Sequence, residues 1–448
     1  MNVRAVSMLV LLALVLSLPA VAPVVAQEMA TLPSDEDWTR DAHARGRLFD
    51  VVAERLEAVY FEPSRLDWGS WRARYRDDVV AAGGRAALDA AFRSAFDGLG
   101  DDHSRWLGRI GDGSAVVGRN GGPSFELGIE AMPLDGRGLL ILRVHPGGAA
   151  DRAGLRRGDL LTQVGTTSLQ EPDLGWEMQS RVAAALREGA TRVTVERSAA
   201  AGMEVEVTPR ALPAGAREQA RVTTDPATGV ARLDLPTFAP GTATIVHAAL
   251  AEARLAGADA LVVDLRGNPG GSVLEMGLVV GAVARGTVLE AWSDGTVSWR
   301  LQLAEEEQGL VALLVRQGGP LAGSELGALR VEEPVSWQGP VVVLVDRRSA
   351  SAAEAAAALL ALHANAAVVG NATPGNVESV QRIAFPGGNA AWVAVGELRL
   401  PGGAQLAPVQ VDVQATLDPA ELARGFDAPL AEAVRIVRGL PLTPGRWF

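Results

Sequence analysis

The sequence of 448 residues contains neither lysine nor cysteine. All 41 of its basic Lys/Arg positions are therefore arginine, and any mechanism that needs a lysine amine is excluded. The absence of cysteine excludes disulfides, zinc–thiolate sites and cysteine nucleophiles. No His-Glu-x-x-His spacing occurs, so we expect neither a metal nor another cofactor.

Positive charge is also scarce. The formal net charge is -12, which argues against a general nucleic-acid-binding protein, because such proteins present a basic face. Only 21% of the residues are charged and 48% are hydrophobic, so the chain is not predicted to be disordered. A chain of this length usually forms two or three domains.

Residues 1–26 resemble an export signal. Arg4 supplies a short positive region, residues 8–18 form an apolar run too short to span a membrane comfortably, and small residues precede Gln27. An uncleaved anchor is the alternative, but the short apolar run and the final alanine favour cleavage. We expect an exported protein, periplasmic or extracellular, without a stable membrane span.

The hydrophobic period changes along the rest of the chain and predicts three domains. Residues 35–115 repeat apolar side chains at helical spacing, which indicates an N-terminal helical domain. The pattern over residues 120–212 predicts short strands with one or two helices. Residues 223–448 alternate buried strands with helices, which is typical of an α/β domain with a parallel sheet.

Two strand-to-helix turns in the third domain carry the residues suited to chemistry. Residues 264–271 (Asp-Leu-Arg-Gly-Asn-Pro-Gly-Gly) could present backbone amides to an anion or oxyanion, because glycine lets the backbone approach closely. Residues 349–354 (Ser-Ala-Ser-Ala-Ala-Glu) could expose a serine nucleophile beside the amides that open a helix. The plain alternatives are an ordinary turn and, for Ser351 with Glu354, a helix-capping box.

In this order, the segments resemble those of the tail-specific, or C-terminal processing, serine peptidases (family S41). That family carries an Arg-Gly-Asn-Pro-Gly-Gly turn and, further on, a Ser-Ala-Ser-Ala-x-Glu segment, each after a strand. Residues 99–104 resemble the family's Leu-x-Asp-x-His-Ser segment, and residues 146–159 resemble the middle of a protease-associated PDZ domain. The resemblance covers most of the chain after the export signal.

The resemblance implies an α/β (α+β multidomain) protein with a ClpP/crotonase-like core, an N-terminal helical domain and a PDZ domain. It also implies hydrolysis of peptide bonds by Ser351, with an oxyanion hole formed by the amides of Gly270 or Gly271 and of Ala352. The PDZ domain would dock protein or peptide substrates through their free C-termini. The matching PDZ residues are Phe125, Leu127, Gly128 and Ile129.

The pattern departs from the family at the base. Members usually pair their serine with a lysine in a Thr-x-Gly-Lys segment, whereas residues 373–376 read Thr-Pro-Gly-Asn. Asn376 therefore stands where the lysine belongs, and an asparagine amide is not a useful proton acceptor. Gln381 matches the family's glutamine only one residue out of register.

Three hypotheses follow. In the first, His103 is the base, as a resemblance to the tricorn-like branch of the family implies, although residues 405–412 lack the late glutamate of that branch. In the second, Glu378 orients His103 or is itself the base; Asn376 has a supporting role where His103 is the base. In the third, the protein is an inactive relative that binds C-terminal peptides or apolar ligands. We favour an exported serine endopeptidase with a non-lysine base; the oligomeric state stays open.

Overall fold

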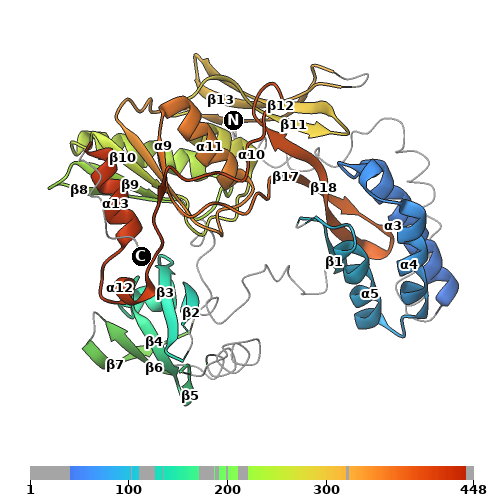
Figure 1. Cartoon of the computed structure of the whole chain (residues 1–448), viewed down its shortest axis with the longest axis horizontal. Coiled ribbons are helices and arrows are strands. Elements are labelled where there is room, and N and C mark those ends of the chain that lie inside the picture. Colours follow the sequence, from blue (N-terminus) through green and yellow to red (C-terminus); the bar gives the residue numbers. More distant parts are fainter. Residues whose placement is uncertain are drawn as a thin grey trace, which may run out of the picture. The chain divides into compact units, whose positions relative to one another are not determined.

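The computed structural model describes residues 41–101, 103–109, 127–134, 136–170, 186, 191–197, 200–209, 220–318 and 322–439. The expected export signal, Phe125 and most of residues 174–186, where the sequence also favours a helix, lie outside these residues. The chain divides into two compact units: Met1–Val116 with Val380–Val395, and Val117–Ser379 with Gly396–Phe448. Figure 1 follows the course of the chain through both.

The first unit packs helices against a short antiparallel β-structure. Its elements are α3 (Ala42–Val59), η2 (Pro63–Arg65), α4 (Trp68–Ala81), α5 (Arg85–Asp97) and β1 (Arg105–Arg109), together with parts of β17 (Glu378–Ala384) and β18 (Asn389–Arg399) and the intervening η3 (Pro386–Gly388). Asp41 and Asp67 cap α3 and α4, since each carboxylate accepts hydrogen bonds from first-turn amides. Strand β1 pairs with β18, and Trp106 stacks on Phe92 with ring centroids 4.2 Å apart. Residues 380–395 thus complete a core that the helices alone leave open.

The PDZ-like part of the second unit is an antiparallel sheet in the order β2-β3-β4-β6-β7, with β5 paired to β4. Its elements are β2 (Ile129–Leu134), β3 (Gly138–Val144), α7 (Ala149–Arg152), β4 (Leu160–Val164), β5 (Thr167–Ser168), β6 (Thr191–Arg197) and β7 (Ala200–Val207). Alternate residues of the strands, such as Ile141, Leu161 and Val193, point into one small apolar core.

The main sheet of the second unit runs in the order β19-β16-β15-β10-β9-β8 and is parallel except for β8. Its strands are β8 (Arg221–Asp225), β9 (Val230–Asp234), β10 (Ala260–Asp264), β15 (Val341–Val345), β16 (Ala367–Gly370) and β19 (Val413–Gln414). Helices α9 (Thr242–Leu255), α10 (Val273–Val280) and α11 (Ala352–Ala364) share a core with Val263 and Val343 on one face. Helix α13 (Ala428–Val437) covers Val262 and Val342 on the other, which is why β10 and β15 read as continuous apolar runs.

An antiparallel arm interrupts the strand–helix alternation that the sequence predicts. It consists of β11 (Gly286–Ser293), β12 (Thr296–Glu306), β13 (Gly309–Arg316) and β14 (Glu325–Val331), and β11 also pairs with Glu397–Arg399 of β18. Leu301, Leu303 and Leu310 of the arm join the core beneath α10. The expectation of alternating strands and helices is therefore wrong over 286–331. Apolar and polar residues alternate too imperfectly there to predict strands.

The PDZ-like sheet contacts the core through α12 (Pro419–Ala423). Leu140, Leu142 and Leu160 form a small apolar cluster with Leu422. Gly158 has φ +88, and a Cβ placed on it would lie 2.5 Å from the Leu422 carbonyl oxygen. Both observations require glycine at this contact.

Candidate active site

Ser351 lies at the corner where β15 is followed by α11. Its backbone has φ 58 and ψ -123, whereas a residue that merely caps a helix has an extended conformation. Among the described non-glycine residues, only Asp294 and Asn365 share a positive φ. Strained backbone of this kind concentrates at functional sites, and a serine on a sharp strand-to-helix turn is the arrangement of a nucleophile elbow. Glu354 does form a capping box with Ser351, as the spacing predicts, but the positive φ is not the backbone of a simple N-cap.

The neighbouring Ser349 has a different environment. Its side chain is fully buried, its hydroxyl donates to the Leu265 carbonyl oxygen at 2.8 Å, and it accepts the Asp346 N–H at 2.9 Å. These bonds tie the ends of β10 and β15 together. Ser351 is half-buried. Of the two serines in this segment, Ser351 is the one placed for chemistry.

The glycine turn lies directly against Ser351. The Ala350 N–H donates to the Asn268 carbonyl oxygen at 3.0 Å, which joins the two turns. Gly270 has φ +100, and a Cβ on it would lie 2.8 Å from the Ser351 Cβ and 3.0 Å from the Ala352 nitrogen. The close approach and the backbone conformation both require glycine here.

The amides at this corner differ in availability. The Gly270 N–H donates to Asn268 Oδ1 at 2.8 Å, and the Asn268 Nδ2 donates to the Leu235 carbonyl oxygen at 2.9 Å. Within the described part of the chain, no acceptor takes the N–H of Gly271 or of Ala352. The buried Asn268, which sequence reasoning did not single out, thus occupies one candidate oxyanion donor and leaves two amides open.

The fully buried Glu354 carboxylate connects Ser351 to the loop that follows β16. Its Oε2 accepts the Ser351 N–H at 3.1 Å, and its Oε1 accepts the Thr373 hydroxyl at 2.5 Å and the Gly375 N–H at 2.8 Å. The Ser351 N–H also donates to the Asn376 carbonyl oxygen at 2.7 Å. Burial raises the pKa of Glu354, against the lowering effect of these hydrogen bonds. The Ser-x-x-Glu spacing pointed to Glu354 only as part of a cap.

His103 belongs to the first unit, in the loop between α5 and β1. The Asp101 Oδ1 accepts the backbone N–H of His103 at 2.9 Å and of Ser104 at 2.5 Å, and its Oδ2 accepts the Tyr60 hydroxyl at 3.0 Å. Burial, and then the Asp101 charge, raise the pKa of Tyr60. These contacts fix the loop that carries the His103 imidazole.

The other predicted site residues belong to the second unit. Asn376 and Glu378 are half-buried, and Glu378 is the first residue of β17. Ile129, the first residue of β2, and Leu127, two residues before it, are buried, and the Gly128 carbonyl oxygen accepts the His145 N–H at 2.8 Å. The second unit thus holds Ser351, Gly270, Gly271, Ala352 and Asn376 around one corner.

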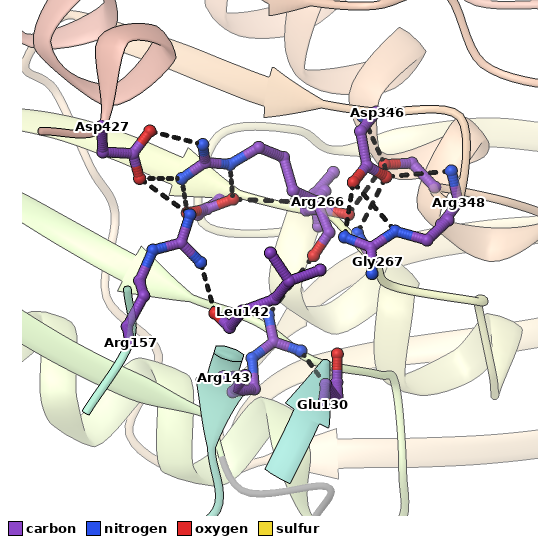
Figure 2. A network of polar contacts seen from close by, with 12 residues as sticks. Glu130, Leu142, Arg143, Arg157, Arg266, Gly267, Asp346, Arg348 and Asp427 are labelled. Atoms are coloured by element: carbon purple, nitrogen blue, oxygen red, sulfur yellow. Dashed lines mark hydrogen bonds and ion pairs between the residues drawn. The ribbon is translucent and has the colours of Figure 1, made fainter. Parts of the chain in front are cut away.

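A network of charged groups anchors the start of the glycine turn (Figure 2). Arg266 pairs with the buried Asp264 at 2.7 Å and with Asp427 at 2.8 Å, and Asp427 also pairs with Arg157 of the PDZ-like part at 2.8 Å. Burial alone would raise the pKa of Asp264, but its ion pair with Arg266 and a second one with Arg232 hold that pKa well below its ordinary value. The network therefore connects the PDZ-like sheet, the turn and the start of α13.

A second pair of contacts lies on the PDZ-like side. Arg143 of β3 pairs with Glu130 at 3.1 Å and, across to β9, with Asp234 at 2.8 Å. A Cβ on Gly267 would lie 3.3 Å from Arg348 Nη2 and 3.5 Å from Glu130 Oε2. PDZ-like side chains thus reach the same glycine turn that supports Ser351 (Figure 2).

Family models match two regions of the chain. Residues 229–415 match the model of peptidase family S41, and residues 140–197 match that of the PDZ domain. A region similar to S41 peptidases thus follows a region similar to PDZ domains. Family S41 comprises serine-type peptidases, so the hydrolase class expected from the motifs is supported.

A relative and two solved structures illustrate the similarity. The chloroplastic C-terminal processing peptidase of Tetradesmus obliquus is 25% identical over 304 residues, which are 63% of this chain and 58% of that protein. The photosystem II D1 C-terminal processing protease is 21% identical, with a TM-score of 0.51 over 88% of this chain and 97% of its own. A Bacteroides fragilis protein assigned to the S41 proteases is 16% identical, with a TM-score of 0.55 over 78% and 90%. The predicted fold class, an S41-type core with a PDZ domain, is confirmed.

Proposed function

We propose that the protein is an exported serine endopeptidase of the tail-specific type, which hydrolyses polypeptides recognised through their free C-termini. Ser351 attacks the scissile carbonyl carbon, and the amides of Gly271 and Ala352 hold the developing oxyanion. Gly270 lets the turn approach the serine. The observation that carries the proposal is the left-handed backbone of Ser351, pressed against a glycine turn that tolerates no Cβ.

The base of the proposed reaction is His103. The sequence has no lysine, Asn376 cannot take a proton at working pH, and the Glu354 carboxylate is buried and already accepts three hydrogen bonds. An imidazole can accept a proton and return it, so the His103 side chain would take the Ser351 proton and then deliver it to the leaving amine. Glu378 and Asn376 would orient the imidazole in this scheme.

Substrate selection falls to the PDZ domain in this proposal. A terminal carboxylate would be held by backbone amides near Leu127, Gly128 and Ile129, while an apolar groove takes the preceding side chains. The name of the Tetradesmus obliquus relative, a C-terminal processing peptidase, is consistent with substrates of this kind.

The proposed location is outside the cytoplasm, on the strength of the export-like residues 1–26. Among the residues that the structure describes, no helix combines the length and apolar character needed to span a bilayer.

Cleavage of an unfolded protein substrate tests the proposal directly. We expect the wild type to degrade a substrate with a free C-terminal carboxylate and to cleave the C-terminally amidated form at least tenfold more slowly. Ser351→Ala should abolish cleavage of both while still binding the free-carboxylate peptide. A wild type that binds such peptides but cleaves nothing would establish the inactive, peptide-binding alternative instead.

The His103→Ala variant tests the base separately. Its cleavage rate should fall by about a thousandfold, a loss within the range seen when a general base is removed. The pH profile of any remaining activity should differ from that of the wild type. Retained activity with the same pH profile in the variant would remove His103 from the mechanism and leave Ser351 in place.

A further inference from the structure

The backbone of Ser351 is held by a set of groups whose contacts with it take no part in the proposed chemistry. We call these groups, Glu354, Thr373, Gly375 and Asn376, the Glu354 clamp. The Ser351 N–H donates both to Glu354 Oε2 and to the Asn376 carbonyl oxygen, at 3.1 and 2.7 Å. The same carboxylate takes the Thr373 hydroxyl and the Gly375 N–H. One buried side chain therefore fixes the serine and the loop together.

Thr373 extends the clamp to a further segment. Its hydroxyl donates to Glu354 Oε1 at 2.5 Å and accepts the Val409 N–H at 2.8 Å, and its side chain is buried. The Thr373 N–H in turn donates to the Val409 carbonyl oxygen at 3.3 Å. The loop is thus tied on two sides, to the first turn of α11 and to the chain that leads into β19.

The environment of the Glu354 carboxylate suits it to hold the backbone conformation of Ser351 and not to exchange protons with substrate. It is fully buried, and each of its oxygens already accepts a hydrogen bond from the protein. A left-handed conformation in a serine persists only where its surroundings enforce it, and the two bonds to the Ser351 N–H are the enforcing contacts on this side of the corner.

We propose that Glu354 is a positioning residue of the peptidase, which sets the backbone of Ser351 through the Thr373–Asn376 loop. The loop corresponds to the segment that carries the lysine in related enzymes; here it supplies no base and serves to place the nucleophile. The catalytic consequence of this inference rests on the proposed function, whereas the structural consequence does not.

The chain contains a matched control. Ser272 and Glu275 open α10 with the same spacing, and the buried Glu275 carboxylate also holds a loop, accepting the N–H of Gly241 at 2.6 Å and of Ala243 at 2.8 Å. Glu275→Gln thus removes a comparable buried carboxylate from the same domain. It should cost similar stability without touching the contacts of Ser351.

Amide hydrogen exchange of the full chain tests the structural half without any need for activity. In Glu354→Gln one carboxylate oxygen becomes an NH2 group, which faces donors and cannot accept their bonds. We expect exchange of the Ser351 and Gly375 amides to accelerate at least tenfold relative to the wild type. Glu275→Gln should instead accelerate the Gly241 and Ala243 amides and leave Ser351 unchanged. Unaltered Ser351 exchange in Glu354→Gln would overturn the proposal.

A fluorophosphonate probe tests the catalytic half, because its concentration dependence separates probe binding (KI) from the chemical step (kinact). We expect Glu354→Gln to lower kinact at least tenfold with KI within twofold, and Glu275→Gln to change neither beyond twofold. Thr373→Val should lower kinact three- to tenfold, and Thr373→Ser, which keeps the hydroxyl, should restore it. An unchanged kinact in Glu354→Gln, or a loss shared equally by Glu275→Gln, would refute the positioning role.

The two halves also separate this inference from the proposed function. A wild type that neither labels nor cleaves refutes the peptidase proposal, and the exchange experiment then decides alone whether the Glu354 clamp sets the Ser351 backbone. If the wild type reacts with the probe, but Glu354→Gln changes neither Ser351 amide exchange nor kinact, only the Glu354 clamp is refuted.

Discussion

Two corners of the same sheet begin with the same four-residue spacing and fold differently. At the β10–α10 corner Ser272 has φ -68 and ψ 125, and its hydroxyl accepts the Glu275 N–H at 3.3 Å, as an ordinary N-cap does. At the β15–α11 corner Ser351 has φ 58 and ψ -123. A Ser-x-x-Glu spacing therefore predicts where a helix begins, but it does not tell which part the serine plays.

The difference lies in which residue carries the unusual backbone. At the first corner the positive φ angles fall on Gly267, Gly270 and Gly271, which adopt them at little cost. At the second corner no glycine is present between β15 and α11, and the left-handed conformation falls on Ser351 itself. The second corner must be held in place from outside, and we infer that Glu354 does this.

Substitution of Gly270 should have the largest effect, because it forces the two corners apart. In Gly270→Ala the new methyl group would meet the Ser351 Cβ at 2.8 Å. We expect cleavage and probe labelling to fall about a hundredfold or more, since a displacement of about 1 Å at a reacting group has that cost. Gly257→Ala is the control, because Gly257 also has a positive φ, +88, but open space around it. If both variants lose activity equally, the close approach is not what matters.

Removal of the Asp427 charge should loosen the first corner. Asp427→Asn keeps a good N-cap for α13 but leaves Arg266 and Arg157 without one of their partners. Breaking a buried pair in this way costs about 3 kcal/mol of unfolding free energy, which urea denaturation would report. Asp418→Asn changes an exposed N-cap that makes only first-turn hydrogen bonds and should cost less than about 0.5 kcal/mol. Equal losses would show that the network adds nothing beyond the cap.

Glycine should have opposite effects at the two serines. Ser351→Gly removes the side chain that makes a positive-φ backbone costly, so it should be more stable than the wild type by about 1 kcal/mol. Ser272→Gly has no such strain to relieve and loses the hydroxyl that accepts the Glu275 N–H, so it should be less stable than the wild type by about 0.3 kcal/mol. Thermal unfolding of the two variants and the wild type measures both differences. A loss of stability at both positions would contradict strain at Ser351.

Lowering the pH should reduce the free energy of unfolding through His247, which contacts the helix of the β10–α10 corner. His247 of α9 contacts the Leu278 carbonyl oxygen of α10 at 2.9 Å and accepts the Val335 N–H, and burial lowers its pKa from 6.5. The unfolded chain therefore takes up a proton below about pH 6.5 that the folded state resists, and stability falls as pH falls. For one proton the slope is at most about 1.4 kcal/mol per pH unit.

Protonation of Glu354 affects stability in the opposite direction to protonation of His247. Its raised pKa means that ionisation opposes folding, so protonation at lower pH does not remove stability there. Urea denaturation between pH 7.5 and 5.5 should therefore show a decline in the wild type that is shallower in His247→Gln. Identical slopes in the two proteins would remove His247 as the source.

Much of the fold could be predicted from the sequence. Continuous apolar runs predict the buried strands at 260–264 and 341–345. The positions of the glycine turn and Ser351 directly after those strands mark them as candidate site residues. The arm at 286–331 was missed because its half-exposed strands lack a clear period of two. Asn268 and Thr373 were missed because a polar residue in a turn reveals nothing of the donor or acceptor that the fold brings to it.

Mass spectrometric mapping of the fluorophosphonate adduct identifies the nucleophilic serine. We expect a single adduct on Ser351 in the wild type, none in Ser351→Ala, and none on Ser349 or Ser272 in either protein. An adduct on another serine, or no adduct on a folded wild type, would contradict the assignment of Ser351 as the nucleophile.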